Sequence, residues 1–116
     1  MNKTQGIRQF NYPVKDIAQA KTLYSKLLGV EPYADEVYYV GFRIGDQEIG
    51  LAPNGYRQGM TGPVAYFEVN DIEDTLQRLL EAGAQIHQKV RDVGGGKLIA
   101  TVKDADGNIT GLIQMP

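Results

Sequence analysis

The chain has 116 residues, 42% of them hydrophobic and 22% charged, with a formal net charge of −2 and no cysteine. The length predicts a single compact domain with a core of its own. The absence of cysteine excludes disulfides, thiolate nucleophiles and cysteine metal sites, and the slightly acidic balance does not favour nucleic acid as a partner. There is no apolar signal segment and no run of 18 apolar residues, so we expect a cytoplasmic protein outside the membrane.

A short motif that occurs twice predicts an internal duplication. Val14–Ile17 (VKDI) returns as Val69–Ile72 (VNDI), 55 residues later (69 − 14). Each copy follows a strand-like run and opens an amphipathic helix, and self-similarity of this kind indicates repeated structural modules. We therefore expect two modules, at about residues 7–53 and 63–115, joined by a linker at 54–62 that contains three glycines.

In the first module, alternation predicts a strand at Ile7–Pro13. The next element is a helix with Asp16 as N-cap and Gly29 after its end. A weak strand follows near Val30–Tyr33. Two further strands, at Glu36–Ile44 and Gln47–Ala52, are joined by a Gly45-Asp46 turn. The apolar stripe of the helix has a period of 3.6 residues and consists of Ile17, Ala20, Tyr24, Leu27 and Leu28.

The second module repeats this order. A strand at Pro63–Val69 precedes a helix that Asp71 caps and Gly83 ends, with a stripe of Ile72, Leu76, Leu79 and Leu80. The remaining strands are expected at Gln85–Asp92, Lys97–Lys103 and Ile109–Met115. The predicted order is therefore βαβββ, twice. His87 is the only histidine, and because it alternates with Lys89 and Arg91 we expect it on a solvated face.

These motifs together resemble the vicinal oxygen chelate superfamily, which includes glyoxalase I, the fosfomycin and bleomycin resistance proteins and the extradiol dioxygenases. The resemblance rests on both Val-x-Asp-Ile motifs, on helices ending in Leu-Gly and Ala-Gly, and on the Asp-x-Asp-Gly-Asn turn at Asp104–Asn108. It covers nearly the whole chain. It implies an α+β fold of two tandem βαβββ modules forming a half-open barrel around a cleft, and a homodimer with two equivalent clefts.

The resemblance also implies where a metal ion would bind. Metal-dependent relatives hold a divalent cation through four side chains, and the matching positions here are Gln9, Gly50, Val64 and Gly111. Three of these residues have no side-chain donor, whereas a divalent cation needs oxygen or imidazole ligands. We therefore expect a member of the family that uses no metal or other cofactor. Glu48 and Glu68 lie close to empty positions, and either could join a displaced site.

Strand alternation predicts the remaining residues of the cleft. Gln9 and Asn11 would offer amide hydrogen bonds, and Tyr66 and Ile113 would add an aromatic and an apolar surface. For the strand at 36–44, packing of the more apolar face under the helix would turn Tyr39 and Arg43 toward the cleft, although the choice of face stays open. Tyr39 and Tyr66 could stack on a ligand, and Arg43 could pair with an anionic group.

Structural interpretations of the same residues remain open. Glycine in a strand is typical of a bulge or of close packing, the tyrosines could fill the core or a dimer interface, and Arg43 could be a solvated charge.

The leading hypothesis on function is a metal-independent protein that binds a small organic ligand. The alternative is a glyoxalase-like lyase or isomerase with an atypical metal site or acid–base chemistry at Glu48 and Glu68. A third possibility is a module that acts through protein contacts.

Overall fold

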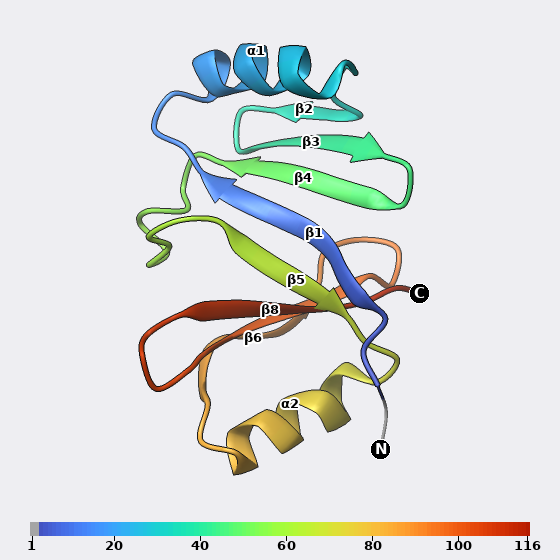
Figure 1. Cartoon of the computed structure of the whole chain (residues 1–116), viewed down its shortest axis with the longest axis vertical. Helices are drawn as coiled ribbons and strands as arrows, with labels where there is room; N and C mark the ends of the chain where they lie inside the picture. The colour runs from blue at the N-terminus through green and yellow to red at the C-terminus, as the bar shows by residue number, and fades with distance from the viewer. Residues whose placement is uncertain (1–2) are drawn as a thin grey trace. The chain divides into compact units, whose positions relative to one another are not determined.

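The computed structural model describes residues 3–116, which form eight strands and two helices (Figure 1). These residues group into two compact units. One unit comprises Gln9–Val64, and the other comprises the remaining described residues on both sides of it. Each unit is built around one helix and one group of four strands, so each has a core of its own.

The first unit has the order βαβββ. Its sheet order is β2-β3-β4-β1, in which β1 runs parallel to β4 and the other pairs are antiparallel. Only the part of β1 from Gln9 onward belongs to this unit. The elements are β1 (Gly6–Pro13), α1 (Ile17–Leu28), β2 (Ala34–Glu36), β3 (Tyr39–Ile44) and β4 (Gln47–Ala52).

The second unit repeats the same order and pairing. Its sheet order is β5-β8-β7-β6, with β5 parallel to β8. The elements are β5 (Val64–Glu68), α2 (Ile72–Glu81), β6 (Gln85–Asp92), β7 (Leu98–Lys103) and β8 (Ile109–Gln114). In both units the first strand pairs with the last, and this confirms the α+β fold class of two βαβββ modules predicted from the repeated motif.

Helix α1 covers one face of the first sheet. The Asp16 carboxylate accepts a hydrogen bond from the backbone N–H of Gln19 at 3.0 Å, and Gly29 ends the helix at φ 73°. A buried core of Val40, Phe42 and Leu51 packs against the helix residues Ile17, Ala20, Tyr24 and Leu28. Leu27, predicted in the same stripe, is instead 71% exposed. That part of the prediction is wrong, because the helix presents to this sheet a narrower stripe than the sequence pattern contains.

Helix α2 covers its sheet as predicted. Asp71 caps it by accepting from the backbone N–H of Asp74 at 3.1 Å. The predicted stripe packs in one cluster with residues of the preceding loop, β7 and β8, which are Val69, Ala100, Val102 and Leu112. The exposed side of α2 is polar; within the stripe, Ile72 and Leu76 are buried, and Leu79 and Leu80 are partly buried.

The strand predicted at Glu36–Ile44 is in fact two strands. β2 and β3 form a hairpin in which Glu36 pairs with Tyr39, so Val37 and Tyr38 form the turn and are 88% and 65% exposed. The weak strand predicted at 30–33 is absent there, and β2 begins at Ala34 instead. The β-forming character of Val and Tyr misled the prediction, because strand propensity depends on the partners that a residue finds.

The structure also decides which face of β3 lies under the helix. Val40 and Phe42 pack toward α1, so Tyr39, Gly41 and Arg43 lie on the opposite face. Ile44, expected with the helix-facing residues, is 38% exposed at the end of the strand.

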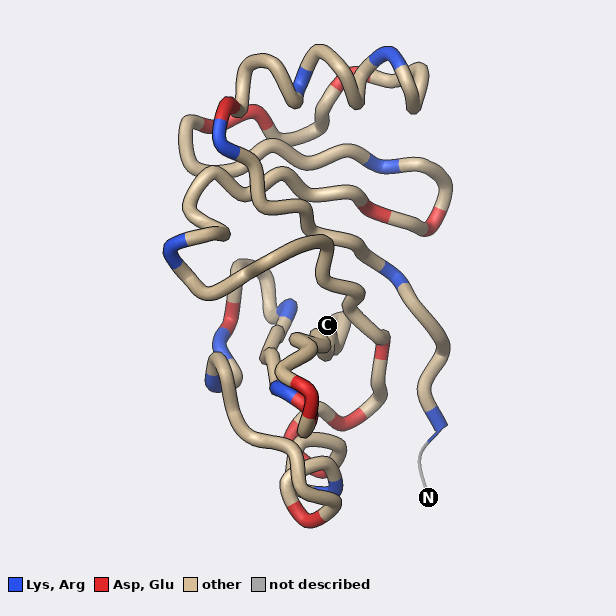
Figure 2. The backbone as a smooth tube through the Cα atoms, turned by 60° about the vertical axis from the view of Figure 1, so that its left-hand side comes forward, with Lys and Arg blue, Asp and Glu red and all other residues tan. Residues whose placement is uncertain are grey.

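Lys and Arg are interspersed with Asp and Glu in both units (Figure 2), so neither unit has a continuous basic surface for a polyanion. Within residues 3–116, neither helix has the length and apolar character that crossing a bilayer requires.

Candidate ligand-binding site

A cluster of polar side chains lies on the face of the first sheet that α1 does not cover. We call this the helix-free face, defined by Gln9 and Asn11 of β1, Tyr39 and Arg43 of β3, and Glu48 of β4. The strand register brings these residues together, since Gln9 pairs with Glu48, and Arg43 pairs with Glu48 from the other side. Gln9 and Glu48 are only 7% and 5% exposed. Burial of polar groups to this extent requires hydrogen-bond partners.

The Gln9 side chain links two of its neighbours. Its amide Nε2 donates to Asn11 Oδ1 at 2.8 Å and to the Tyr39 hydroxyl at 3.3 Å. The three residues were expected at the cleft from sequence, and the structure brings them into one hydrogen-bonded group. Because the Nε2 atom is directed at these oxygens, the amide is held in one orientation.

Glu48 is held beside a guanidinium. Arg43 Nε donates to Glu48 Oε1 at 3.1 Å, and the Arg43 side chain is 63% exposed whereas that of Glu48 is 6% exposed. The same guanidinium stacks on the Tyr33 ring, with its carbon 4.0 Å from the ring centroid. Burial and then the negative charge of Glu48 raise the pKa of the Tyr33 hydroxyl, while a hydrogen bond with Tyr39 and the charge of Arg43 oppose this shift.

Tyr33 was not among the residues predicted for the site. It precedes β2, and its backbone N–H bonds to the carbonyl of Gly41 at 2.9 Å, which places its ring over that glycine. A Cβ at Gly41 would lie 2.9 Å from the rings of both Tyr33 and Tyr39. Gly41, on the same face as Tyr39 and Arg43, was the sequence signal for such a close approach.

The family positions for metal ligands do not fit a divalent cation in this unit. At Gly50, a Cβ would meet Asn11 Oδ1 and would lie 2.5 Å from the Tyr39 hydroxyl, so these two groups fill the space of a ligand side chain. Val64 is buried and has no donor. Gln9 is neutral, and a neutral amide alone does not hold such an ion. Across residues 3–116, no three His, Cys, Asp or Glu side chains gather as a metal site would require.

In the second unit, the corresponding glycine is covered by an aromatic ring. Gly111 lies opposite Tyr66 in the β5–β8 register, and a Cβ at Gly111 would lie 2.6 Å from Cγ of that ring. Tyr66 is 5% exposed and Ile113 is fully buried. The Tyr66 ring therefore occupies the space that the Cβ of a metal-binding side chain at position 111 would need.

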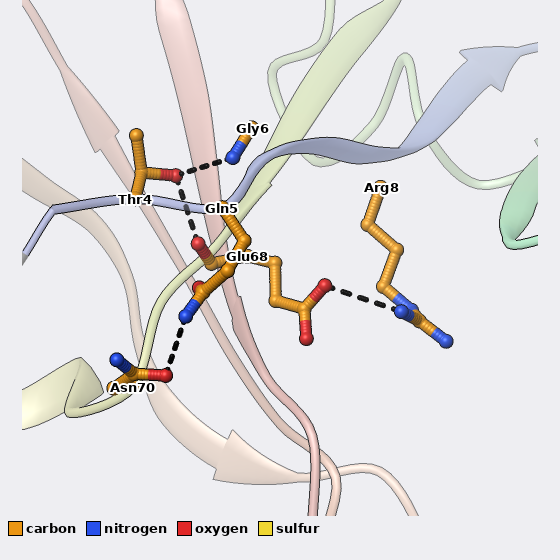
Figure 3. A network of polar contacts seen from close by, with 6 residues as sticks. All are labelled: Thr4, Gln5, Gly6, Arg8, Glu68 and Asn70. Carbon is orange, nitrogen blue, oxygen red and sulfur yellow. Dashed lines mark hydrogen bonds and ion pairs between the residues drawn. The ribbon is translucent and has the colours of Figure 1, made fainter.

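Glu68 takes part in a network at the end of β5. Its carboxylate accepts from Arg8 Nη1 at 3.1 Å, and both side chains are 27% exposed. Its backbone carbonyl accepts from the Thr4 hydroxyl at 2.8 Å and from the Gln5 N–H at 3.0 Å, and Gln5 Nε2 donates to Asn70 Oδ1 (Figure 3). The network fastens the N-terminal segment to the turn before α2. Glu48 and Glu68 thus belong to separate groups, each with its own arginine.

His87 was predicted on a solvated face, but the structure places it differently. Its side chain is half-buried, and its Nδ1 lies 2.9 Å from the hydroxyl of Thr101, a residue that is 2% exposed. Register shifts interrupt the pairing of β6 with β7 on both sides of Gln88. Such irregularities break the simple alternation from which the prediction was made.

With both units described, the architecture can be compared with known proteins. A family model of the Glyoxalase/Bleomycin resistance protein/Dioxygenase superfamily matches residues 6–111, so the chain belongs to this superfamily. The expected family is thereby confirmed. No curated protein sequence matches the chain.

Several solved structures share the fold. Methylmalonyl-CoA epimerase from Mycobacterium tuberculosis is 17% identical, with a TM-score of 0.75 over 97% of this chain and 89% of that one. A superfamily member from Vibrio splendidus 12B01 is 17% identical, with a TM-score of 0.69 over 98% of both chains. A Mn(II)-bound glyoxalase from Novosphingobium aromaticivorans is 19% identical, with a TM-score of 0.74 over 98% of this chain and 40% of that one. At these identities the similarity establishes the fold alone.

Proposed function

We propose that this chain binds a small organic molecule on the helix-free face without chelating a metal ion. The observation that carries the proposal is at Gly50. At the position where metal-dependent relatives carry a metal-binding side chain, this chain has a glycine. The Tyr39 hydroxyl and Asn11 occupy the space that such a side chain would need. The chemistry available on this face is therefore that of hydrogen bonds and aromatic rings.

The composition of the face suits recognition of an organic ligand. The rings of Tyr33 and Tyr39 provide flat apolar surface. Tyr33 is 43% exposed, so part of its ring is accessible to a ligand. On the same face, Gln9 and Glu48 are buried and already oriented by their neighbours. Fixed polar groups among apolar surface are typical of small-molecule sites, because fewer groups must be ordered when the ligand binds.

A second candidate is a glyoxalase-like lyase or isomerase, and one observation favours it. Glu48 is a buried carboxylate beside the Tyr33 hydroxyl and the Arg43 guanidinium, the kind of setting in which a carboxylate serves as a general base. Solved structures with this fold include an epimerase and a Mn(II)-bound glyoxalase. In this candidate, Glu48→Gln would abolish turnover of a substrate while leaving its binding measurable.

A thermal-shift experiment tests the leading proposal. We expect no stabilisation by Mn²⁺, Ni²⁺ or Zn²⁺, and a rise in melting temperature with some members of a library of small aromatic compounds, since ligands stabilise by mass action. Tyr39→Phe, which removes only the hydroxyl, should reduce the rise, whereas Tyr56→Phe, an exposed tyrosine of the same unit, should not. Stoichiometric metal in the purified protein, or strong stabilisation by one of the ions, would overturn metal independence.

A further inference from the structure

Arg43 differs from the other ion-paired arginines of the described chain in how it is held. Its Nε bonds to a carboxylate that is almost fully buried, and its plane rests on the Tyr33 ring at 4.0 Å. Arg8 has one contact to a half-buried partner, and Arg78 pairs with the exposed Asp74 along its own helix. Contacts on one edge and one face fix both the position and the tilt of the Arg43 guanidinium.

The remaining donors of Arg43 are available. Among residues 3–116 neither Nη1 nor Nη2 has a hydrogen-bond partner, and the side chain is 63% exposed. A guanidinium whose Nε is engaged still presents two parallel N–H groups on its Nη atoms, the geometry that matches the two oxygens of a carboxylate or phosphoryl group. Because the orientation is already fixed, little conformational entropy is lost when an anion binds.

We infer that Arg43 receives an anionic group of the ligand, either a carboxylate or a phosphoryl group, and that the organic part of the ligand lies against the rings of Tyr33 and Tyr39. This inference rests on the proposed function and specifies its ligand class. Glu48 offsets much of the charge of Arg43, so binding depends on the fork geometry of the guanidinium more than on net positive charge. Lysine, which has the charge without the fork, should therefore be a poor substitute.

The test is a titration followed by NMR with probes that share one ring and differ in charge. The probes are benzoate and phenyl phosphate as anions, benzamide as the neutral analogue and benzamidine as the cation, with inorganic phosphate as the anion that lacks a ring. We expect the two ring anions to bind best. Arg43→Ala and Arg43→Lys should each weaken them by about 10- to 100-fold, the range of a charge-assisted hydrogen bond. The control Arg57→Ala, an exposed arginine of the same unit, should leave binding unchanged.

The outcomes separate this inference from the proposed function. If benzamide binds as well as benzoate and Arg43→Ala alters neither, or if benzamidine binds best, the anion assignment is wrong and the organic-ligand site stands. If inorganic phosphate binds as tightly as phenyl phosphate with the same dependence on Arg43, the anion assignment stands and the organic-ligand proposal is wrong. If no probe binds, both are wrong.

Discussion

Gly111 and Gly50 lie at two positions where the family resemblance implies a metal ligand and where this chain has no side chain. In each case an aromatic or amide side chain from a neighbouring strand lies where a Cβ would begin. Neither glycine has a positive φ, so neither is required by backbone conformation. Close packing is therefore the physical reason for glycine at both positions, and any larger residue must displace its neighbour.

Replacing Gly111 by alanine tests this packing. The new Cβ would overlap the Tyr66 ring, which is 5% exposed and has little room to move. We expect Gly111→Ala to lower the free energy of unfolding by about 1–3 kcal/mol, the usual range for overpacking. The measurement is urea denaturation followed by circular dichroism. Gly62→Ala is the control, because a Cβ there meets nothing within 4 Å; equal stability of the two variants would contradict the close-packing account.

Tyr33 gives the helix-free face a dependence on alkaline pH. Burial and the charge of Glu48 raise the pKa of Tyr33 above its ordinary value of 10.0. Because the folded state holds the proton of the Tyr33 hydroxyl more tightly than the unfolded state does, this hydroxyl contributes to the free energy of unfolding. The contribution is fully present below pH 10 and is lost as the pH rises through the folded-state pKa.

We therefore expect the stability of the wild type relative to Tyr33→Phe to decrease above pH 10. The measurement compares urea midpoints of the two proteins between pH 8 and 11, and the difference isolates Tyr33 from the other tyrosines. A constant difference across this range would show that the folded protein does not favour the protonated hydroxyl.

At the scale of elements, the two helices occupy equivalent places in the repeat but differ in their outer faces. Helix α2 carries charged residues outward, whereas α1 exposes Leu23 and Leu27, one turn apart. The apolar stripe of α1 is therefore wider than the part of the helix surface that packs against the sheet of its unit. A sequence pattern of this kind cannot tell which of its apolar residues meet the sheet, and Leu27 was assigned wrongly for that reason.

A pair of leucine substitutions measures this difference between the helices. Leu76 of α2 is 7% exposed and belongs to the core of its unit, so Leu76→Ala should cost about 2–5 kcal/mol. Leu27→Ala makes the same chemical change at a residue that is 71% exposed, and should change stability by no more than about 0.5 kcal/mol. Guanidinium denaturation gives both values, and a large loss in Leu27→Ala would mean that another surface covers this residue.

At the scale of the whole molecule, we propose a homodimer, as the family resemblance implied. Sedimentation equilibrium at micromolar concentration should give twice the chain mass of 12.8 kDa. A monomer under these conditions would contradict the proposal.

The sequence by itself determined the repeated module, both helix caps, most strand bounds and the superfamily. These features follow from local rules, since a cap needs only its own turn and alternation needs only its own strand. The absence of donors at Gly50, Val64 and Gly111 was equally plain, because it requires no geometry.

Only the tertiary structure decided how the candidate site is assembled. Register paired Glu48 with Arg43 and with Gln9, and a loop placed Tyr33 over Gly41; the glycine indicates a close approach, but no local pattern identifies Tyr33 as the residue that makes it. The same applies to His87, whose place depends on irregular pairing of β6 with β7. In each case the position of a side chain depends on a strand or loop distant in sequence, whose energy of contact outweighs the local preference.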